Sequence, residues 1–397
     1  MSFLRYKSTY NIKIETSGRK SASIEGSAFI KIFGDSGETP VITLSPPQAS
    51  FSKGSLTMFS VEMLTNLGSI HEINLGHSSS KKWLVQNIEI QNTDTREKWS
   101  FPCCQWIDGA DDKIPKKKLY PVQESKEPLK KERILSLICG GSNRTHVDKA
   151  AKGLQGEDSF FFIDRTCVSP FAPYNAIGVA DGVADWRYKK NIDAGEYARQ
   201  LMDQCEETIY ARDMVTPYSV ISEAKSSMDR LDTPGSCTAV ICVLNRRSYE
   251  LQSYVLGDSK LLVIRDGTIL YASPSQQKRF ILSSIGGESV TEGAQYNIKL
   301  KSGDMILVGS DGLFDNIYEE TLCNHIWRLR AANPTDLAAF LTKMAADISV
   351  SETDETPWSR EASDQLDMVY KGGKKDDITA VIGKVVSEKR EILPNSG

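Results

Sequence analysis

Short runs of alternating apolar and polar residues follow one another through the first 108 residues. Turn residues, such as Ser17-Gly18 and Pro46-Pro47, separate the runs. Alternation with a period of two buries one face of a strand, and evenly spaced short strands are typical of antiparallel sandwiches. The runs lie at residues 10–15, 28–34, 41–44, 58–64, 70–76, 83–92 and 99–106. We therefore expect residues 1–108 to form an all-β sandwich.

The pattern changes after residue 108. Residues 109–134 are charged, contain three prolines and have few apolar positions, which predicts a linker. Beyond it, apolar residues at helical spacing over 194–212 and 334–348 alternate with buried strand-like runs. Those runs lie at residues 238–244, 261–267, 304–312 and 378–386. We expect an α+β domain over 135–388, followed by a tail at 389–397.

Composition places the chain among ordinary globular proteins. It has 397 residues, of which 40% are hydrophobic and 25% charged, and its formal net charge is -4. These values argue against a largely disordered chain and give no support to nucleic-acid binding. The acidic residues are concentrated in the C-terminal part, where a cation site would need them. The patterns indicate no particular oligomeric state.

The cysteines and the N-terminus bear on the compartment. None of the eight cysteines forms a CxxC pair, so we expect free thiols rather than zinc ligands or disulfides. The first residues show neither an apolar signal segment nor a long Arg-rich leader. We expect a cytoplasmic location, with peripheral membrane attachment left open, rather than a mitochondrial one.

Four segments place carboxylates at the edges of apolar strands. They are Gly156-Glu157-Asp158, Ala180-Asp181-Gly182, Ser310-Asp311-Gly312 and Lys375-Asp376-Asp377-Ile378. An isolated Asp-Gly is usually a turn. Four such segments in one domain suggest a shared site, and converging carboxylates repel one another unless a cation is present. Mg²⁺ and Mn²⁺ prefer oxygen ligands, and two such ions can clamp a phosphate and activate water.

The segments GEDSFF, GVADGVADW, PGSCTAVICVL, VLGDSKLLVIRDG, ILVGSDGLFDNI and KKDDITAVI occur in this order between about residues 135 and 387. Together they resemble the protein phosphatase 2C family of metal-dependent phosphatases. The resemblance implies a central β-sandwich flanked by helices, with two Mg²⁺ or Mn²⁺ ions at one end. It implies direct attack of activated water on phosphoserine or phosphothreonine, with no phosphoenzyme.

The resemblance also implies roles for individual residues. Asp181 would bridge the two ions. Glu157 and the carbonyl of Gly182 would complete one ion site, and Asp311 and Asp376 would complete the other. These assignments come from matching the family's motifs to this sequence.

Further family positions are occupied by Asp158, which would orient a metal-bound water, and by Asp258 and Asp315, which match a third, weaker ion site. Many members have a phosphate-binding Arg four residues before the metal Glu. Here that position is Gly153, and the adjacent Lys152 is our candidate phosphate contact, with a surface lysine as the alternative.

Several residues depart from the family pattern or carry no clear role. Val183 replaces a His that many members use as a candidate general acid, and Asp185 adds a carboxylate without an assigned function. Cys237 is better interpreted as a buried strand residue than as a nucleophile, and His146 as a surface residue. The polar stretch at 349–373 is either a lid or substrate platform near Asp376, or a disordered insertion.

The N-terminal part has a resemblance of its own. Over about residues 8–107 it is similar to the PLAT (lipoxygenase-homology) domain, with matches at Tyr10, Gly34, Phe59, Gly68, Trp83 and Trp106. This implies an eight-stranded sandwich that binds membranes or protein partners, in some members with Ca²⁺. Arg19 replaces an expected acid, which weakens the Ca²⁺ expectation. Trp83 and Trp106 are expected in the core rather than at an interface.

Three functions follow from these patterns. The first is a serine/threonine protein phosphatase acting on phosphoproteins, with residues 1–108 directing it to a membrane surface or a protein partner. The second is a pseudophosphatase adaptor that binds phosphoproteins or lipids without turnover, motivated by Val183 and Gly153. The third is a phosphatase of small molecules. The retained carboxylates favour the first.

Overall fold

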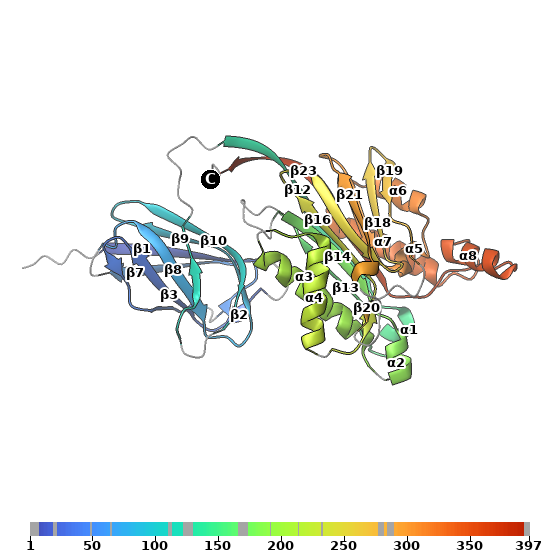
Figure 1. Ribbon diagram of the computed structural model, residues 1–397, viewed down its shortest axis with the longest axis horizontal. Helices are drawn as coiled ribbons and strands as arrows, with labels where there is room; N and C mark the ends of the chain where they lie inside the picture. Colours follow the sequence, from blue (N-terminus) through green and yellow to red (C-terminus); the bar gives the residue numbers. More distant parts are fainter. Residues whose placement is uncertain are drawn as a thin grey trace, which may run out of the picture. The chain divides into compact units, whose positions relative to one another are not determined.

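The computed structural model describes residues 8–18, 22–47, 50–63, 66–109, 113–121, 130–165, 174–190, 192–212, 214–231, 233–276, 282–283 and 290–392. They form two compact units (Figure 1), and each unit is described by itself below. The smaller unit is built on residues up to 131. The larger is built on residues 132–165 and 173–390. The division after residue 131 falls within the predicted linker.

The smaller unit is a sandwich of two antiparallel sheets. One has the strand order β10-β9-β1-β7, and the other has the order β11-β8-β3-β4 with β5 beside β3. The strands are β1 Ser8–Thr16, β2 Ile24–Glu25, β3 Ala28–Gly34, β4 Gly37–Glu38, β5 Ile42–Leu44, β6 Ser50–Phe51, β7 Leu56–Met63, β8 Ile70–His77, β9 Trp83–Asn92, β10 Lys98–Ile107 and β11 Lys117–Leu119. Alternate residues of both sheets, such as Ile12, Ile32 and Ile88, form one buried core. The expected all-β sandwich is therefore confirmed.

The sandwich continues beyond residue 108. Within the predicted linker, Lys117–Leu119 pairs with Ile73–Leu75 of β8, and Leu119 is 6% exposed. The Nζ of Lys118 lies 3.4 Å from a carboxylate oxygen of Glu72. This part of 109–134 is thus an edge strand rather than a linker, because one apolar residue is enough to anchor a three-residue strand on the core.

The aromatic residues of this unit are mostly internal. Trp83 is fully buried, its ring centroid lies 4.5 Å from that of Phe51, and its indole N–H donates to the hydroxyl of Thr16. Trp106 is half-buried. The expectation that Trp83 belongs to the core is confirmed. Arg19, on which the weakened Ca²⁺ expectation rests, lies outside the described residues.

The larger unit is built on two five-stranded antiparallel sheets, with the orders β12-β23-β22-β18-β19 and β13-β14-β16-β17-β21. Its strands are β12 Lys130–Arg144, β13 Asp158–Ile163, β14 Tyr174–Asp181, β15 Ser236–Cys237, β16 Ala239–Asn245, β17 Glu250–Leu256, β18 Lys260–Arg265, β19 Thr268–Ala272, β20 Leu282–Ser283, β21 Ala294–Lys299, β22 Met305–Gly309 and β23 Ile378–Ile392. Apolar residues from both sheets, such as Leu137, Ile177, Val240, Ile306 and Val381, form one core. The sheets therefore pack face to face.

Helices cover both outer faces of this sandwich (Figure 1). They are α1 Val147–Ala150, α2 Asp185–Lys190, α3 Ala194–Ala211, α4 Pro217–Arg230, α5 Asp311–Phe314, α6 Glu319–Arg328, α7 Pro334–Ser349 and α8 Pro357–Leu366, with a 3₁₀ turn at Val290–Glu292. Helices α3 and α4 pack on the sheet that contains β14 and β16. Apolar residues of α6 and α7 share a core with the outer face of β18 and β22. The predicted α+β sandwich flanked by helices is confirmed.

The stretch at 349–373 contains a helix that the sequence analysis did not predict. Helix α8 begins with a capping box, in which Thr356 and Ser359 exchange side-chain and backbone hydrogen bonds and Pro357 occupies the first turn. The backbone N–H of Trp358 donates to the carbonyl of Asp315 at 3.0 Å. The stretch is therefore partly helical and attached beside a predicted metal position.

No helix in the described part of the chain is long and apolar enough to cross a bilayer.

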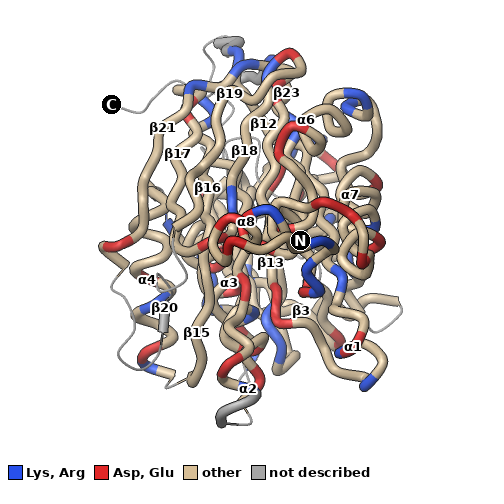
Figure 2. Tube along the Cα trace, turned by 90° about the vertical axis from the view of Figure 1, so that its right-hand side faces the viewer, with Lys and Arg blue, Asp and Glu red and all other residues tan. Residues whose placement is uncertain are grey.

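Acidic segments lie beside basic ones around α8 (Figure 2). Such mixing of signs gives no support to a nucleic-acid surface, in line with the net charge of the chain.

Candidate metal centre

The ends of strands from both sheets bring the predicted carboxylates together. Asp158 opens β13 and is the direct cross-strand partner of Asp181, which closes β14. On the other sheet, Asp311 follows β22 and begins α5, and Asp376 precedes β23, the strand that pairs with β22. Two pairs of adjacent strand ends, one pair from each sheet, thus supply two aspartates each.

The glycines that follow Asp181 and Asp311 are required by close packing of the backbone. A Cβ on Gly182 would lie 2.7 Å from the carbonyl oxygen of Ala194 and 2.8 Å from that of Glu157. A Cβ on Gly312 would lie 2.1 Å from the carbonyl oxygen of Asp377. The Asp-Gly pairs are therefore fixed by their neighbours rather than by turn formation alone.

Hydroxyl groups hold the backbone of Asp181 and the carboxylate of Asp158 at the β13–β14 end. The N–H of Asp181 donates to Thr238 Oγ1 at 3.1 Å, and the N–H of Thr238 donates back to the Asp181 carbonyl at 2.9 Å. Ser310 Oγ donates to Asp158 Oδ2 at 2.7 Å and accepts from the N–H of Thr379 at 2.9 Å. Ser310 therefore links the two sheets at the site and restrains Asp158.

The carboxylates raise one another's pKa values. Burial and the charges of Asp158, Asp311 and Asp376 raise the pKa of Asp181 well above its ordinary value. Burial, followed by the charge of Asp377, raises the pKa of Asp158 to about 8. Burial and the charge of Asp311 raise the pKa of Asp376 to about 6. Such mutual destabilisation of charged forms is expected where a cation would be bound.

The positions linked to a third ion share this field. Burial and the charge of Asp311 raise the pKa of Asp258 to about 6. The same two causes raise the pKa of Asp315, against the opposing attraction of Lys374. Asp258 and Asp315 therefore belong electrostatically to the same cluster as Asp311.

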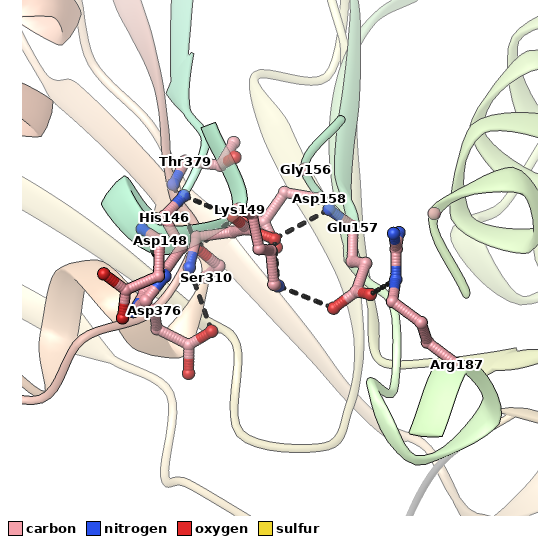
Figure 3. Close-up of polar contacts among 12 residues, drawn as sticks. His146, Asp148, Lys149, Gly156, Glu157, Asp158, Arg187, Ser310, Asp376 and Thr379 are labelled. Carbon is pink, nitrogen blue, oxygen red and sulfur yellow. Dashed lines mark hydrogen bonds and ion pairs between the residues drawn. The ribbon is translucent and has the colours of Figure 1, made fainter. Parts of the chain in front are cut away.

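Glu157 lies between two cationic side chains (Figure 3). Lys149 Nζ contacts Glu157 Oε2 at 2.6 Å, and Arg187 Nε donates to Glu157 Oε1 at 2.7 Å. Lys149 also contacts Asp377 Oδ2 at 2.7 Å. Arg187 contacts Asp193, the N-cap of α3, at 2.9 Å. Each oxygen of the Glu157 carboxylate therefore has a cationic partner, and the side chain, only 2% exposed, is rigidly placed.

A second ammonium group lies among the other carboxylates. Lys374 Nζ contacts Asp311 Oδ2, lies 2.7 Å from Asp315 Oδ2 and lies 3.3 Å from Asp376 Oδ2. Burial by itself favours the neutral amine, but the charges of these three aspartates raise the pKa of Lys374 above its ordinary value. Lys374 is therefore a permanent cation within the acidic cluster.

The chemistry of the donor set fits a hard divalent cation. In the described residues, no three His, Cys, Asp or Glu side chains are placed ready to hold an ion, and the Lys149 and Lys374 ammonium groups lie between the carboxylates instead. Even so, Asp158 Oδ1 and Asp311 Oδ1 are buried without a hydrogen-bond partner among those residues. Buried carboxylate oxygens left without a partner are unfavourable, and an oxygen-preferring cation would satisfy them.

The remaining candidates lie away from the carboxylates or serve structural roles. Lys152 is exposed on the turn after α1, and its role as a phosphate contact stays a prediction. His146 caps α1 with its side chain, and its backbone N–H donates to Asp377 Oδ1 at 2.6 Å. Cys237 is fully buried in β15, which confirms the expected buried strand residue, and burial raises the pKa of its thiol. Asp185 is exposed on α2.

Sequence reasoning missed Lys149, Arg187 and Lys374. The signal for Lys374 was its place two residues before Asp376, and the signal for Arg187 was its place in the segment that follows Asp181. Nothing in the spacing of Lys149, eight residues before Glu157, indicated a contact. The two residues meet only because the turn after α1 brings the chain back toward Lys149 before it reaches Glu157.

Comparison with protein families matches both units. Residues 10–120 match the PLAT/LH2 domain, and residues 190–385 match the family described as Stage II sporulation protein E (SpoIIE). Among solved structures, the larger unit is similar to the X-ray structure of the photosystem II phosphatase PBCP. The TM-score is 0.55 at 26% identity, and the match covers 62% of this chain and 98% of that one.

Curated relatives extend the match to sequence. The chain is 33% identical over 266 residues to probable protein phosphatase 2C 55 of Arabidopsis thaliana, covering 65% of this chain and 53% of that protein. It thus spans about half the length of the plant relatives it matches first. It is 34% identical over 286 residues to the protein phosphatase PTC7 homolog fig of Drosophila virilis, covering 66% of this chain and 84% of that protein. This similarity shows that the chain belongs to the protein phosphatase 2C family.

Proposed function

We propose that the chain is a Mg²⁺- or Mn²⁺-dependent serine/threonine protein phosphatase that acts on phosphoproteins. The observation that carries the proposal is the meeting of Asp158, Asp181, Asp311 and Asp376 at strand ends of both sheets. Two of these side chains keep a buried oxygen without a hydrogen-bond partner in the described chain. Membership of the family supports the same reaction.

The residues that would hold two ions are those the motifs indicate. Asp181 would be shared, Glu157 and the Gly182 carbonyl would serve one ion, and Asp311 and Asp376 would serve the other. Two bound divalent cations would supply Lewis-acid activation of water and neutralise phosphate charge. Within this set, the backbone of Asp181 and Gly182 is held by the hydrogen bonds of Thr238 and by the close packing around Gly182.

Asp158 has a different part in the proposed reaction. Its Oδ2 is occupied by Ser310, whereas its Oδ1 lacks a hydrogen-bond partner in the described chain. The free oxygen can accept a hydrogen bond from a water and so orient it. In the metal-free chain, burial and the charge of Asp377 raise the pKa of Asp158 to about 8.

The test of the proposal is hydrolysis of p-nitrophenyl phosphate and of a phosphothreonine peptide by the full chain, with Mn²⁺, Mg²⁺ or EDTA. Turnover with either metal that disappears in EDTA supports the phosphatase. Comparison of the peptide with small phosphate esters separates a protein phosphatase from a phosphatase of small molecules. A folded chain without turnover in any metal would refute the proposal.

The adaptor without turnover remains the second candidate. The observation in its favour is that Val183 offers no proton to a leaving group where many family members have His. It predicts that the chain binds a phosphothreonine peptide with the same affinity in EDTA and in Mn²⁺. The phosphatase predicts turnover instead, so one set of samples distinguishes the two.

For the PLAT domain we propose a targeting role, toward a membrane surface or a protein partner. The sandwich exposes Leu56 and Met58 on the edge strand β7, at 52% and 63%. Flotation of the full chain with neutral and acidic liposomes, with and without Ca²⁺, tests the membrane role. Binding only to acidic liposomes supports an electrostatic contact, whereas no binding in any arm removes the membrane and leaves a protein partner.

The raised pKa values predict how pH changes the effect of metal. Asp158 and Asp376, with ordinary values near 3.8, reach about 8 and about 6 in the folded chain. Their stabilising contribution is complete below pH ~4 and is lost as pH rises through about 6 and then 8. In EDTA, the larger unit should therefore lose stability between pH 5 and 8, as the carboxylates ionise beside one another.

Added Mg²⁺ should reverse this loss, because protons no longer compete for the same oxygens at high pH. The rise in Tm on adding Mg²⁺ should thus be larger at pH 8 than at pH 6. Thermal melts of the full chain at both pH values, in EDTA and in excess Mg²⁺, measure the effect. An equal or smaller rise at pH 8 would show that these carboxylates do not bind the ion.

A further inference from the structure

Lys374 is fixed by the structure in the part of the acidic cluster that faces Asp315. Its Nζ contacts Asp311 and lies 2.7 Å from Asp315 and 3.3 Å from Asp376, and its side chain is only 21% exposed. An ammonium has three donors, and here three carboxylates surround it. The lysine therefore occupies the cluster as a ligand-bound cation would.

The backbone of Lys374 is held as firmly as its side chain. Asn316 Oδ1 accepts from the N–H of Lys374 at 2.9 Å, and Asn316 Nδ2 donates to the Lys374 carbonyl at 2.9 Å. The same Nδ2 donates to the carbonyl of Gly312 at 2.8 Å, and Asn316 is 2% exposed. A buried amide thus ties Lys374 to the turn that carries Asp311 and Asp315, so the ammonium is built into the site.

This position coincides with the carboxylates that the motifs associate with a third ion. Asp315 contacts the ammonium directly, and the charge of Lys374 lowers the pKa of Asp258 against the effects of burial and Asp311. A divalent ion between Asp311 and Asp315 would have to displace the ammonium or lie beside it, and like charges at such a distance repel strongly. The ammonium, which contacts Asp311 through Oδ2, therefore competes with a third ion between Asp311 and Asp315. Asp311 Oδ1 is buried without a hydrogen-bond partner among the described residues and so stays available to the second of the two ions.

We propose that Lys374 is a resident cation that takes the place of a third divalent ion between Asp311 and Asp315, so that the chain binds two ions and no more. The proposal rests on the proposed function, since it presupposes the two-ion centre. It assigns Lys374 a positioning role. The ammonium holds Asp311 and Asp315 in place and neutralises the negative charge that the two divalent ions do not compensate.

The alternative is that Lys374 is a loose salt-bridge partner that leaves when ions enter, after which a third ion binds normally. The neighbouring Lys375 provides the matched control, because it carries the same charge one residue away and is exposed. Lys374→Met keeps the length of the aliphatic stem and removes the charge. Lys374→Gln is a second variant, for the case that Met disturbs packing.

The experiment counts Mn²⁺ bound to the full chain, by titration with the EPR signal of free Mn²⁺ as the readout. Wild type and Lys375→Met should bind about two Mn²⁺ per chain. Lys374→Met and Lys374→Gln should bind about three, and the added ion should be lost again when Asp315→Asn is combined with either variant. This readout needs no turnover.

Each outcome decides between the possibilities. Three Mn²⁺ on wild type, or two on every Lys374 variant, overturns the assignment of Lys374 while leaving the two-ion centre intact. Fewer than two Mn²⁺ on wild type overturns the two-ion centre of the proposed function, and the lysine assignment with it. Wild type alone is sufficient to overturn the proposal, so the test does not depend on the variants folding.

Discussion

Asp181→Asn is expected to abolish phosphatase turnover while the fold remains intact. Asp181 is the only carboxylate that the motifs place on both ions, and its pKa is raised by Asp158, Asp311 and Asp376 together. Loss of a residue that merely supports a ligand typically costs about 10- to 100-fold in activity, so loss of the shared ligand should cost more than about 100-fold. The measurement is kcat/KM for a phosphothreonine peptide in Mn²⁺.

The same substitution should leave the chain in EDTA as stable as wild type, or more stable. Asn keeps the size of the side chain, and it removes one of several like charges that burial disfavours. Thermal melts in EDTA and in Mn²⁺ therefore provide a second readout, in which the variant loses the stabilisation by Mn²⁺ but not its fold. Loss of activity through misfolding would instead lower Tm in both conditions.

Asp185→Asn is the matched control, because it makes the same chemical change on the exposed start of α2, four residues along the chain. Its activity should stay close to that of wild type. If Asp181→Asn kept the wild-type rate, the assignment of Asp181 would be wrong. If Asp185→Asn lost activity as well, Asp185 would take part in the site.

The carboxylate positions could be predicted from the sequence because they are tied to strand ends. Asp181 and Asp311 each follow an apolar run and precede Gly, and the structure places Asp181 at the end of β14 and Asp311 two residues beyond β22. Local sequence is sufficient there, because burial fixes the strand and the strand fixes its last residue. The reason for the glycine was less visible, since Gly312 is required by the carbonyl of Asp377, distant in sequence.

The cations around the carboxylates could not be predicted in the same way. Lys149 reaches both Glu157 and Asp377, and the latter contact joins residues 228 positions apart. Lys374 reaches Asp311 across 63 positions. A lysine has a long flexible stem and is usually solvated at the surface, so its type gives no sign of burial. Only tertiary structure shows that these lysines belong to the site.

The two local errors of the sequence analysis have different causes. β11 has three residues, and two of them are lysines. The charged composition therefore predicted a linker, although Leu119 is buried. Helix α8 has mostly polar residues and buries only Ser359, so it lacks an apolar stripe. Its capping box at Thr356 and Ser359 was the available signal, and it shows that caps can identify a helix where hydrophobic spacing cannot.

Asp377→Ala is expected to destabilise the larger unit by about 3 kcal/mol or more. Asp377 is 2% exposed, and its carboxylate accepts from the N–H of His146 at 2.6 Å, from the N–H of Glu157 at 2.7 Å and from Lys149. Truncation leaves the N–H groups of His146 and Glu157 without this acceptor, and it removes one of the two carboxylates that pair with the Lys149 ammonium. In a unit of this size, that should lower Tm by on the order of 10 °C, measured calorimetrically with each unit's transition fitted separately.

Two further variants separate the buried network from a general effect of losing charge. Asp347→Ala removes a carboxylate that is 65% exposed on α7, and it should change stability by less than about 0.5 kcal/mol. Lys149→Met removes the ammonium that Asp377→Ala leaves stranded, so the double variant should be more stable than the sum of the two single losses predicts. Additive losses, or a cost of Asp377→Ala as small as that of Asp347→Ala, would show that Asp377 does not hold Lys149, Glu157 and His146 together. A positive coupling would instead establish Asp377 as the structural support of the Glu157 half of the site. That role accounts for the difference between the two adjacent aspartates: Asp377 is buried, whereas the side chain of Asp376 is 31% exposed.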